Sequence, residues 1–264
     1  MKIAIIGTGN LGKSIAKGLI KNNVVSSLYL TKRHVDSLKE FEGAKRVTLT
    51  SDNALAIQHS DILIFAVQPS QIENILKKVK PLITENHVVI STITGYAISK
   101  IEAVVGVDKY ILRAMPNTAI SVGQSMTCIA SNEKGKEKMQ QALNIFNSLG
   151  RSTEIHEELI QAATVICASG IAFWMRLIRA TTQGAIQLGF EAHEAQELAV
   201  QTCFGAASLL IQSGSHPEQE IDRVTTPRGC TIEGLNEMEH QGLSSSLIKG
   251  IVASFEKINQ IKTN

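Results

Sequence analysis

Three glycines near the start of the chain lie between a short apolar run and a helical pattern. Residues 2–6 are mostly isoleucine, which is typical of a buried parallel strand, and residues 13–20 continue with helical periodicity. Between them, Gly7 permits a tight turn, Gly9 lets the backbone approach a pyrophosphate, and Gly12 lets the helix pack on the strand. The segment predicts a Rossmann-type dinucleotide site, with an ordinary tight strand-to-helix turn as the alternative.

The residues after the second expected strand indicate which dinucleotide binds. Thr31, Lys32 and Arg33 follow an apolar run at residues 27–30. NAD-binding folds place an Asp or Glu about 20 residues after the glycines, where it binds the ribose 2′-hydroxyl. A hydroxyl and two cations suit a 2′-phosphate instead, because arginine can form a bidentate pair with phosphate. We therefore expect NADP(H), with NADPH preferred and NADH possible; a solvated basic loop is the alternative.

Strands and helices alternate through the rest of the first half. Apolar runs at residues 61–67, 87–92 and 110–115 are separated by helical stretches such as residues 72–79. This alternation predicts a parallel sheet with helices on both faces. Loops at the carboxyl ends of the strands should then border the cofactor. These loops comprise residues 66–69, 91–95 and 115–118.

The second half is rich in helix-forming residues. Residues 164–188 are expected to form one long helix ended by Gly189, and residues 192–212 another. The second helix carries many small residues, and a helix that is apolar or small around most of its circumference is buried. Because about 110 residues build only a small core, we expect this half to pair with another copy. A self-contained helical bundle is the alternative.

The predicted fold class is therefore α/β, in two domains. Residues 1–154 are expected to form a Rossmann-type, mainly parallel sheet that binds NADP, and residues 155–264 are expected to form an all-helical dimerisation domain. A chain of 264 residues with 44% hydrophobic content can bury a core of this size. A net charge of +2 without a basic cluster argues against nucleic acid as a partner. We expect no apolar run of membrane-spanning length, no membrane partner and no signal peptide.

The cysteines and histidines indicate the compartment and argue against a metal site. Cys128, Cys167, Cys203 and Cys230 lie far apart without a CxxC spacing, which favours free thiols in a reducing cytoplasm. The seven histidines show no pairing at the spacing of metal ligands. We expect a cytoplasmic protein without a metal ion.

A short segment at residues 224–235 interrupts the helical pattern. Pro227 and Gly229 mark a turn, after which helical spacing resumes. Three hydroxyls gather there, those of Thr225, Thr226 and Thr231. Beside the free N–H groups of a helix start, they would form an anion cradle with a proton donor next to it. An N-cap on an ordinary helix is the alternative.

Several segments together resemble the Δ1-pyrroline-5-carboxylate reductase family, which performs the last step of proline biosynthesis. They are the glycine turn and residues 66–69, 113–118, 168–173 and 224–235. The resemblance spans essentially the whole chain, and the Met-Pro-Asn-Thr and Thr-Thr-Pro-x-Gly-x-Thr elements are far more specific than the glycines. It implies NADPH-dependent hydride transfer to the cyclic imine Δ1-pyrroline-5-carboxylate, giving L-proline.

The resemblance also implies roles for individual residues. The cofactor pyrophosphate would be held by Gly7, Thr8, Gly9, Asn10, Leu11 and Gly12, and the 2′-phosphate would lie near Thr31, Lys32 and Arg33. Further cofactor contacts would come from Ala66, Val67, Gln68, Pro69 and Asn117. The substrate carboxylate would be bound by Thr226, Gly229, Cys230 and Thr231. The Thr231 hydroxyl would hydrogen-bond the pyrroline nitrogen as the catalytic residue. Helices of two protomers interlock in the family, which implies a homodimer or a higher homo-oligomer.

The chain departs from the family pattern near the predicted substrate site. The paired glycines after the proline are here Arg228 and Gly229, and Cys230 replaces a Thr or Ala. Four further departures are Gln68 for Lys, Ile171 for Pro, Phe173 for Tyr and Arg179 for Glu. These changes bear on substrate specificity rather than on the type of reaction.

Two other functions stay open. The first is a reductase for another cyclic imine or for a small β-hydroxy acid; the latter usually needs a lysine base on the long helix, and residues 164–188 contain none. The second is a non-catalytic, NADP-binding redox sensor. Retention of Thr226, Gly229 and Thr231 argues against a decayed substrate site.

Overall fold

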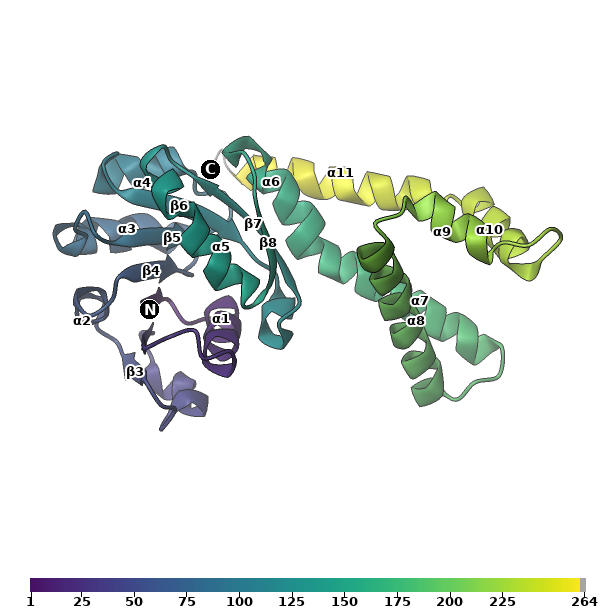
Figure 1. The fold of residues 1–264 in the computed structure, drawn as a ribbon, viewed down its shortest axis with the longest axis horizontal. Helices are drawn as coiled ribbons and strands as arrows, with labels where there is room; N and C mark the ends of the chain where they lie inside the picture. Colours follow the sequence, from purple (N-terminus) through teal and green to yellow (C-terminus); the bar gives the residue numbers. More distant parts are fainter. Residues whose placement is uncertain (262–264) are drawn as a thin grey trace. The chain divides into compact units, whose positions relative to one another are not determined.

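The computed structural model describes residues 1–261 (Figure 1). Contacts within the chain define two units. One comprises Met1–Ser169 with the described residues from Phe255 on, and the other comprises Gly170–Ser254. Residues 155–169 group with the first unit, whereas the sequence placed the domain boundary after residue 154. They are held there partly by Glu157, which accepts hydrogen bonds from the buried Arg113 side chain (2.9 Å) and the Ile98 N–H (2.7 Å).

The first unit is built on one sheet. Among the described residues this sheet has eight strands in the order β3-β2-β1-β4-β5-β6-β7-β8, and every pairing except β6–β7 is parallel. The strands are β1 (Lys2–Ile6), β2 (Ser27–Thr31), β3 (Val47–Thr50), β4 (Ile62–Phe65), β5 (Val88–Ser91), β6 (Tyr110–Met115), β7 (Ser125–Ser131) and β8 (Gly150–Glu154). The predicted α/β class with a mainly parallel sheet is confirmed.

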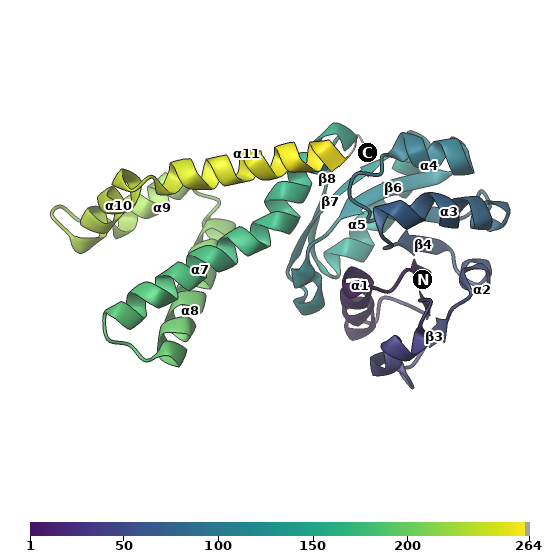
Figure 2. The same ribbon diagram turned by 180° about the vertical axis from the view of Figure 1, so that it is seen from behind.

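Helices cover both faces of this sheet (Figures 1 and 2). Because successive strand side chains point to opposite faces, Ile3 and Ile5 of β1 join one core cluster while Ala4 and Ile6 join the other. The helices α1 (Asn10–Lys21) and α5 (Met139–Asn147) pack on the first face, and α2 (Asn53–Gln58), α3 (Pro69–Val79) and α4 (Ile98–Val105) on the second. Short 3-10 turns complete the unit: η1 (Val35–Phe41), η2 (Lys80–Leu82), η3 (Thr118–Val122), η4 (Lys134–Lys138) and η5 (Glu157–Leu159).

The strand order reverses at β1, whose neighbours are β2 and β4. On the two sides of this point the chain crosses over opposite faces of the sheet. A crevice therefore forms between these connections at the carboxyl ends of the strands. The β1–α1 turn lies at that crevice. The fold thus places the glycine turn where open α/β sheets bind their ligands.

The second unit contains only helices among its described residues. It comprises α7 (Gly170–Gln187), α8 (Ala192–Ser213), α9 (Pro217–Val224), α10 (Cys230–His240) and the part of α11 (Leu243–Ile261) that precedes Phe255. Helix α7 continues a helical run that begins in the first unit with α6 (Ile160–Ala163) and the π-helical η6 (Thr164–Ser169). Gly189 and Gly214 take positive φ after α7 and α8, which is typical of helix ends. The two predicted long helices and the all-helical class are confirmed.

The long helices expose much apolar surface in the isolated chain. Met175 of α7 is 62% and Phe204 of α8 is 61% exposed, whereas on α8 only Ala195 and Ala199 are buried. One helical run in the described part of the chain, residues 157–187, is long and apolar enough to cross a membrane by length and composition. The expectation that no stretch reaches that length is therefore wrong by this measure. Helix–helix association requires the same apolar surface, so composition alone does not separate the two roles.

Candidate active site

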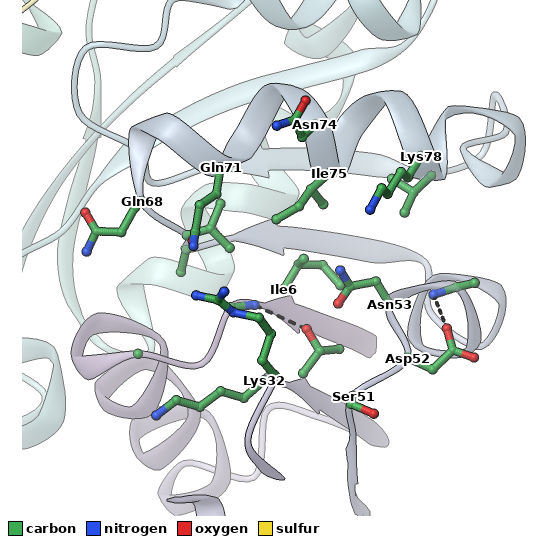
Figure 3. Close-up of a pocket in the computed structure, with 18 of the residues that line it drawn as sticks. Ile6, Lys32, Ser51, Asp52, Asn53, Gln68, Gln71, Asn74, Ile75 and Lys78 are labelled. Atoms are coloured by element: carbon green, nitrogen blue, oxygen red, sulfur yellow. Dashed lines mark hydrogen bonds between the residues drawn. The ribbon is translucent and has the colours of Figure 1, made fainter.

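A cavity of about 680 Å³ opens at the carboxyl ends of β1, β2 and β4 (Figure 3). Lys32, Ser51 and Asn53 lie on one side of it, and Gln71 and Lys78 of α3 lie on the other. Cationic and amide side chains around this cavity suit a phosphorylated ligand. The cavity lies wholly within the first unit.

Eight of the predicted cofactor residues line this cavity: Gly7, Gly9, Thr31, Lys32, Arg33, Ala66, Val67 and Gln68. The other six lie outside its wall. Asn10, Leu11 and Gly12 form the first turn of α1, Thr8 is buried, Pro69 begins α3 and Asn117 follows β6. The sequence did not single out the wall residues Ser51, Asp52, Asn53, Ala54, Ser70, Gln71, Asn74, Ile75 and Lys78.

The three glycines have the geometry that a dinucleotide turn requires. Gly7 has φ +91°, and a Cβ there would collide with Val67. A Cβ on Gly12 would lie 2.9 Å from the Gly7 carbonyl oxygen, whereas one on Gly9 would meet no atom within 4 Å. Helix α1 has no side-chain cap and no acidic residue in its first turn, so its first N–H groups stay available to an anion. The residues present therefore fit the pyrophosphate of a dinucleotide.

The residues beside the glycine turn fit a 2′-phosphate. Lys32 and Arg33 line the cavity, and neither forms an ion pair with another described residue. Asp52 also lines it, but its carboxylate accepts hydrogen bonds from the N–H groups of Ala54 (2.8 Å) and Leu55 (3.3 Å) as the N-cap of α2. Two unpaired cations and an acid already engaged in capping give this end of the cavity a preference for negative charge.

Asn117 holds three segments together next to the sheet. Its side-chain amide donates to the carbonyl of Cys167 (2.9 Å), and its amide oxygen accepts from the N–H of Ala119 (2.9 Å). Its backbone N–H donates to the hydroxyl of Ser125 (3.1 Å). The side chain is thereby fixed between η3 and η6, and the backbone of Asn117 is tied to the start of β7.

The predicted substrate residues lie on one turn of the second unit. The backbone carbonyl of Thr226 accepts a hydrogen bond from the N–H of Gly229 (2.9 Å), so Pro227 and Arg228 are the central residues of a β-turn. Arg228 has φ +58°, the left-handed conformation that the second central residue of a type II turn needs. A Cβ on Gly229 would collide with the Thr226 hydroxyl. The turn therefore requires glycine at 229 and carries strain at 228.

Helix α10 begins directly after this turn. Gly229 is its N-cap, without a side-chain cap, and Thr231 is its second residue. The Thr231 hydroxyl has no hydrogen-bond partner among the residues the structure describes, and neither does that of Thr226. Thr231 is therefore not the cap that the alternative interpretation required. Its hydroxyl and the first N–H groups of α10 stay available to a ligand.

No group of three or more His, Cys, Asp or Glu side chains in the described residues could hold a metal ion. The two sites present backbone N–H groups, hydroxyls, amides and cations. A dinucleotide site on a Rossmann-type sheet, followed by helices with exposed apolar side chains, is typical of one class of protein: oxidoreductases with an NADP-binding domain and a helical domain that dimerises.

Comparisons with known proteins define the family. Residues 157–261 match the family described as pyrroline-5-carboxylate reductase dimerisation, and residues 2–95 match NADP oxidoreductase coenzyme F420-dependent. Pyrroline-5-carboxylate reductase 2 of Dictyostelium discoideum is 43% identical, over 97% of this chain and 91% of its own length. Pyrroline-5-carboxylate reductase 1 of the same organism is 44% identical over 99% of this chain, which spans about half of that relative's length.

A solved structure agrees over the full length. The pyrroline carboxylate reductase of Plasmodium falciparum with NADP bound has a TM-score of 0.88 at 25% identity, covering 99% of this chain and 98% of that one. The chain belongs to the pyrroline-5-carboxylate reductase family, as the sequence motifs predicted. The chain has pyrroline-5-carboxylate reductase activity, which is an oxidoreductase activity of proline biosynthesis. Its first half is an NADP-binding domain.

Proposed function

We propose that this enzyme uses NADPH in preference to NADH to reduce Δ1-pyrroline-5-carboxylate to L-proline. The observation that carries the cofactor preference is the pair of cavity cations, Lys32 and Arg33, without an ion-pair partner among the described residues. The acid in the same cavity, Asp52, is engaged in capping α2. A 2′-phosphate would therefore gain charge-assisted hydrogen bonds that a 2′-hydroxyl does not.

The protein's own part in the reaction is binding and orientation. When bound, NADPH supplies the hydride that the imine carbon accepts. The glycine turn would hold the pyrophosphate on the first N–H groups of α1, with Asn10, Leu11 and Gly12 in that turn. We assign the substrate carboxylate to the first N–H groups of α10, at Cys230 and Thr231, next to Thr226 and Gly229.

Thr231 is the proposed catalytic residue. Its hydroxyl, which has no partner among the described residues, would hydrogen-bond the ring nitrogen and orient the imine. Reduction changes the charge and geometry at this nitrogen, so a fixed polar partner can stabilise the transition state more than the ground state. Ala66, Val67, Gln68, Pro69 and Asn117 are the proposed contacts on the nicotinamide side.

We further propose that the functional unit is a homodimer or a higher homo-oligomer of cytoplasmic location. Exposed apolar side chains on α7 and α8 support the first part, since an obligate interface covers such residues. Four free thiols support the second, because a reducing compartment maintains them.

A turnover assay tests the proposed function. Δ1-pyrroline-5-carboxylate should be reduced at a higher kcat/KM with NADPH than with NADH. With NADPH, its kcat/KM should also exceed that of a six-membered cyclic imine, and that of a small β-hydroxy acid assayed with NADP in the direction of oxidation. A higher kcat/KM for one of these alternative substrates would instead identify the rival reductase. NADPH binding without turnover of any of them would identify the redox sensor.

A further inference from the structure

Two cysteines of the first unit are 39 residues apart in the sequence, and their sulfur atoms are in contact. The sulfur of Cys128, on β7, lies 3.9 Å from the sulfur of Cys167, on η6. Cys128 is 5% exposed, and Cys167 is half-buried. Both are free thiols, and the proposed reaction uses neither. The pair is thus a preformed dithiol with one accessible member.

The surroundings of the pair are apolar. Cys128 packs with Met115, Ala130 and Ile160, and Cys167 lies against the same cluster. The hydrogen bond between the two sulfurs lowers the pKa of the Cys167 thiol, and the same hydrogen bond together with burial raises the pKa of the Cys128 thiol. The accessible sulfur is therefore the one with thiolate character, which is the nucleophilic form.

Cys167 is linked directly to the Asn117 side chain. Its carbonyl accepts the 2.9 Å hydrogen bond from the Asn117 amide, next to the proposed nicotinamide side. It also lies in the π-helical turn between α6 and α7, a local irregularity in an otherwise continuous helical run. A change in the position of Cys167 therefore acts directly on the Asn117 side chain, because one hydrogen bond joins them.

We propose that Cys128 and Cys167 are a peroxide-sensitive dithiol that closes to an intramolecular disulfide and thereby slows turnover. In the first step the Cys167 thiolate attacks hydrogen peroxide; an S–O bond forms, the O–O bond breaks, and the released hydroxide takes up a proton as water. Cys128 then attacks the sulfenic sulfur; the S–S bond forms, the S–O bond breaks, and hydroxide leaves as water with the thiol proton. Two thiols are oxidised by two electrons, and peroxide is reduced to two waters.

The movement falls on η6 rather than on the sheet. A disulfide brings the sulfurs from 3.9 Å to about 2.05 Å apart. Cys128 is fixed because β7 is hydrogen-bonded to β6 on one side and β8 on the other. We therefore expect Cys167 to approach Cys128, and its carbonyl to shift relative to Asn117. A dithiol reductant reverses the change by thiol–disulfide exchange.

Peptide mapping tests the bond independently of activity. The reduced enzyme is treated with equimolar hydrogen peroxide, blocked with an alkylating agent, digested and analysed by mass spectrometry. We expect a Cys128–Cys167 linked peptide in the wild type and in the matched control Cys203→Ser, whose cysteine lies on α8. In Cys128→Ser the link is absent, and Cys167 carries a sulfenic acid that dimedone traps. An unlinked wild type, or a link through Cys203 or Cys230, overturns the proposal.

Steady-state kinetics on the same samples test the effect on turnover. Weakening the Asn117–Cys167 hydrogen bond should lower kcat about fivefold in the oxidised wild type, with full recovery in dithiothreitol. A linked wild type with unchanged kcat overturns the regulatory part. Since kcat is measured before oxidation, failure of the proposed function would appear in the untreated enzyme and is distinguishable. If Cys128→Ser does not fold, Cys128→Ala and the peptide map of the oxidised wild type show whether Cys128 and Cys167 form the disulfide.

Discussion

The hydroxyl of Thr31 accepts a 3.2 Å hydrogen bond from the backbone N–H of Gly7. The carbonyl of Thr31 accepts a second bond, from Thr8 (2.8 Å). Thr31 ends β2 at the point where NAD-binding folds carry the ribose-binding acid, and it is 2% exposed. In this chain the residue therefore supports the glycine turn, and we propose that Lys32 and Arg33 recognise the 2′-phosphate.

Replacing Thr31 by Val should destabilise the protein. Valine has the same shape but no acceptor, so the N–H of Gly7 loses its partner at a cost of about 1–3 kcal/mol. Thr31→Ser keeps the oxygen and is the matched control. Urea unfolding of the three proteins measures the effect. A Thr31→Val variant as stable as Thr31→Ser would show that the bond adds nothing.

Removing both cavity cations should weaken the preference for NADPH. The double variant Lys32→Ala, Arg33→Ala loses the charge-assisted hydrogen bonds to the phosphate, which removes about 1.5–3 kcal/mol of transition-state stabilisation. Its kcat/KM with NADPH should fall by the corresponding factor, while its kcat/KM with NADH should change little. Lys45→Ala, an exposed basic residue outside the cavity wall, is the control. The assignment fails if the NADPH/NADH ratio is the same in the wild type and the double variant.

The central strands could be predicted because their residues are buried on both faces. Strands β1, β4 and β5 are continuous apolar runs, and only a parallel sheet core accounts for such runs between helices. Edge strands lack this signal. In β3 (Val47–Thr50) and β8 (Gly150–Glu154) no residue is fully buried, and β8 is mostly polar, so neither was predicted.

Only part of the cavity wall could be predicted, for a related reason. The glycine turn and residues 31–33 belong to one local motif, which the sequence order displays directly. Ser51 and Asn53 reach the cavity because β3 pairs with β2, and Gln71 and Lys78 reach it because α3 follows β4. These neighbours arise from strand order in the sheet, and no local pattern encodes them.

A charge on the apolar face of α8 should dissociate the oligomer. Phe204 is 61% exposed in the isolated chain, and we expect a second copy to cover it within an interface of more than about 2,000 Å². Phe204→Glu would bury an unpaired carboxylate there, so sedimentation at micromolar concentration should show monomers with little activity. Thr202→Glu adds the same charge at an exposed polar position on the opposite side of α8 and should stay oligomeric. An active wild-type monomer would refute the proposal.

Arg228→Gly should stabilise the turn before α10. Arg228 has φ +58°, and left-handed backbone costs a residue with a side chain about 1–2 kcal/mol. Glycine removes that strain but adds entropy to the unfolded chain, so the net gain in unfolding free energy should be about 1 kcal/mol or less. Arg228→Ala keeps the strain and should match the wild type. Equal stability of the Gly and Ala variants, measured by thermal unfolding, would contradict this interpretation.

Removing the Thr231 hydroxyl should affect turnover more than folding. Gly229 is the N-cap of α10 and Thr231 makes no cap bond, so Thr231→Val should leave the unfolding free energy nearly unchanged. If the hydroxyl bonds the ring nitrogen, losing a hydrogen bond to a charged group worth about 1.5–3 kcal/mol should lower kcat/KM roughly tenfold to a hundredfold.

Two comparisons separate this catalytic role from a structural one. Thr231→Ser keeps the hydroxyl without the methyl group and should retain most of the activity, which a packing role for the methyl would not allow. A bond that strengthens as the imine becomes an amine should lower kcat as well as raise KM in Thr231→Val. If Thr231→Val instead lowers the melting temperature while its kcat/KM stays close to that of the wild type, Thr231 supports the helix start and the catalytic assignment is wrong.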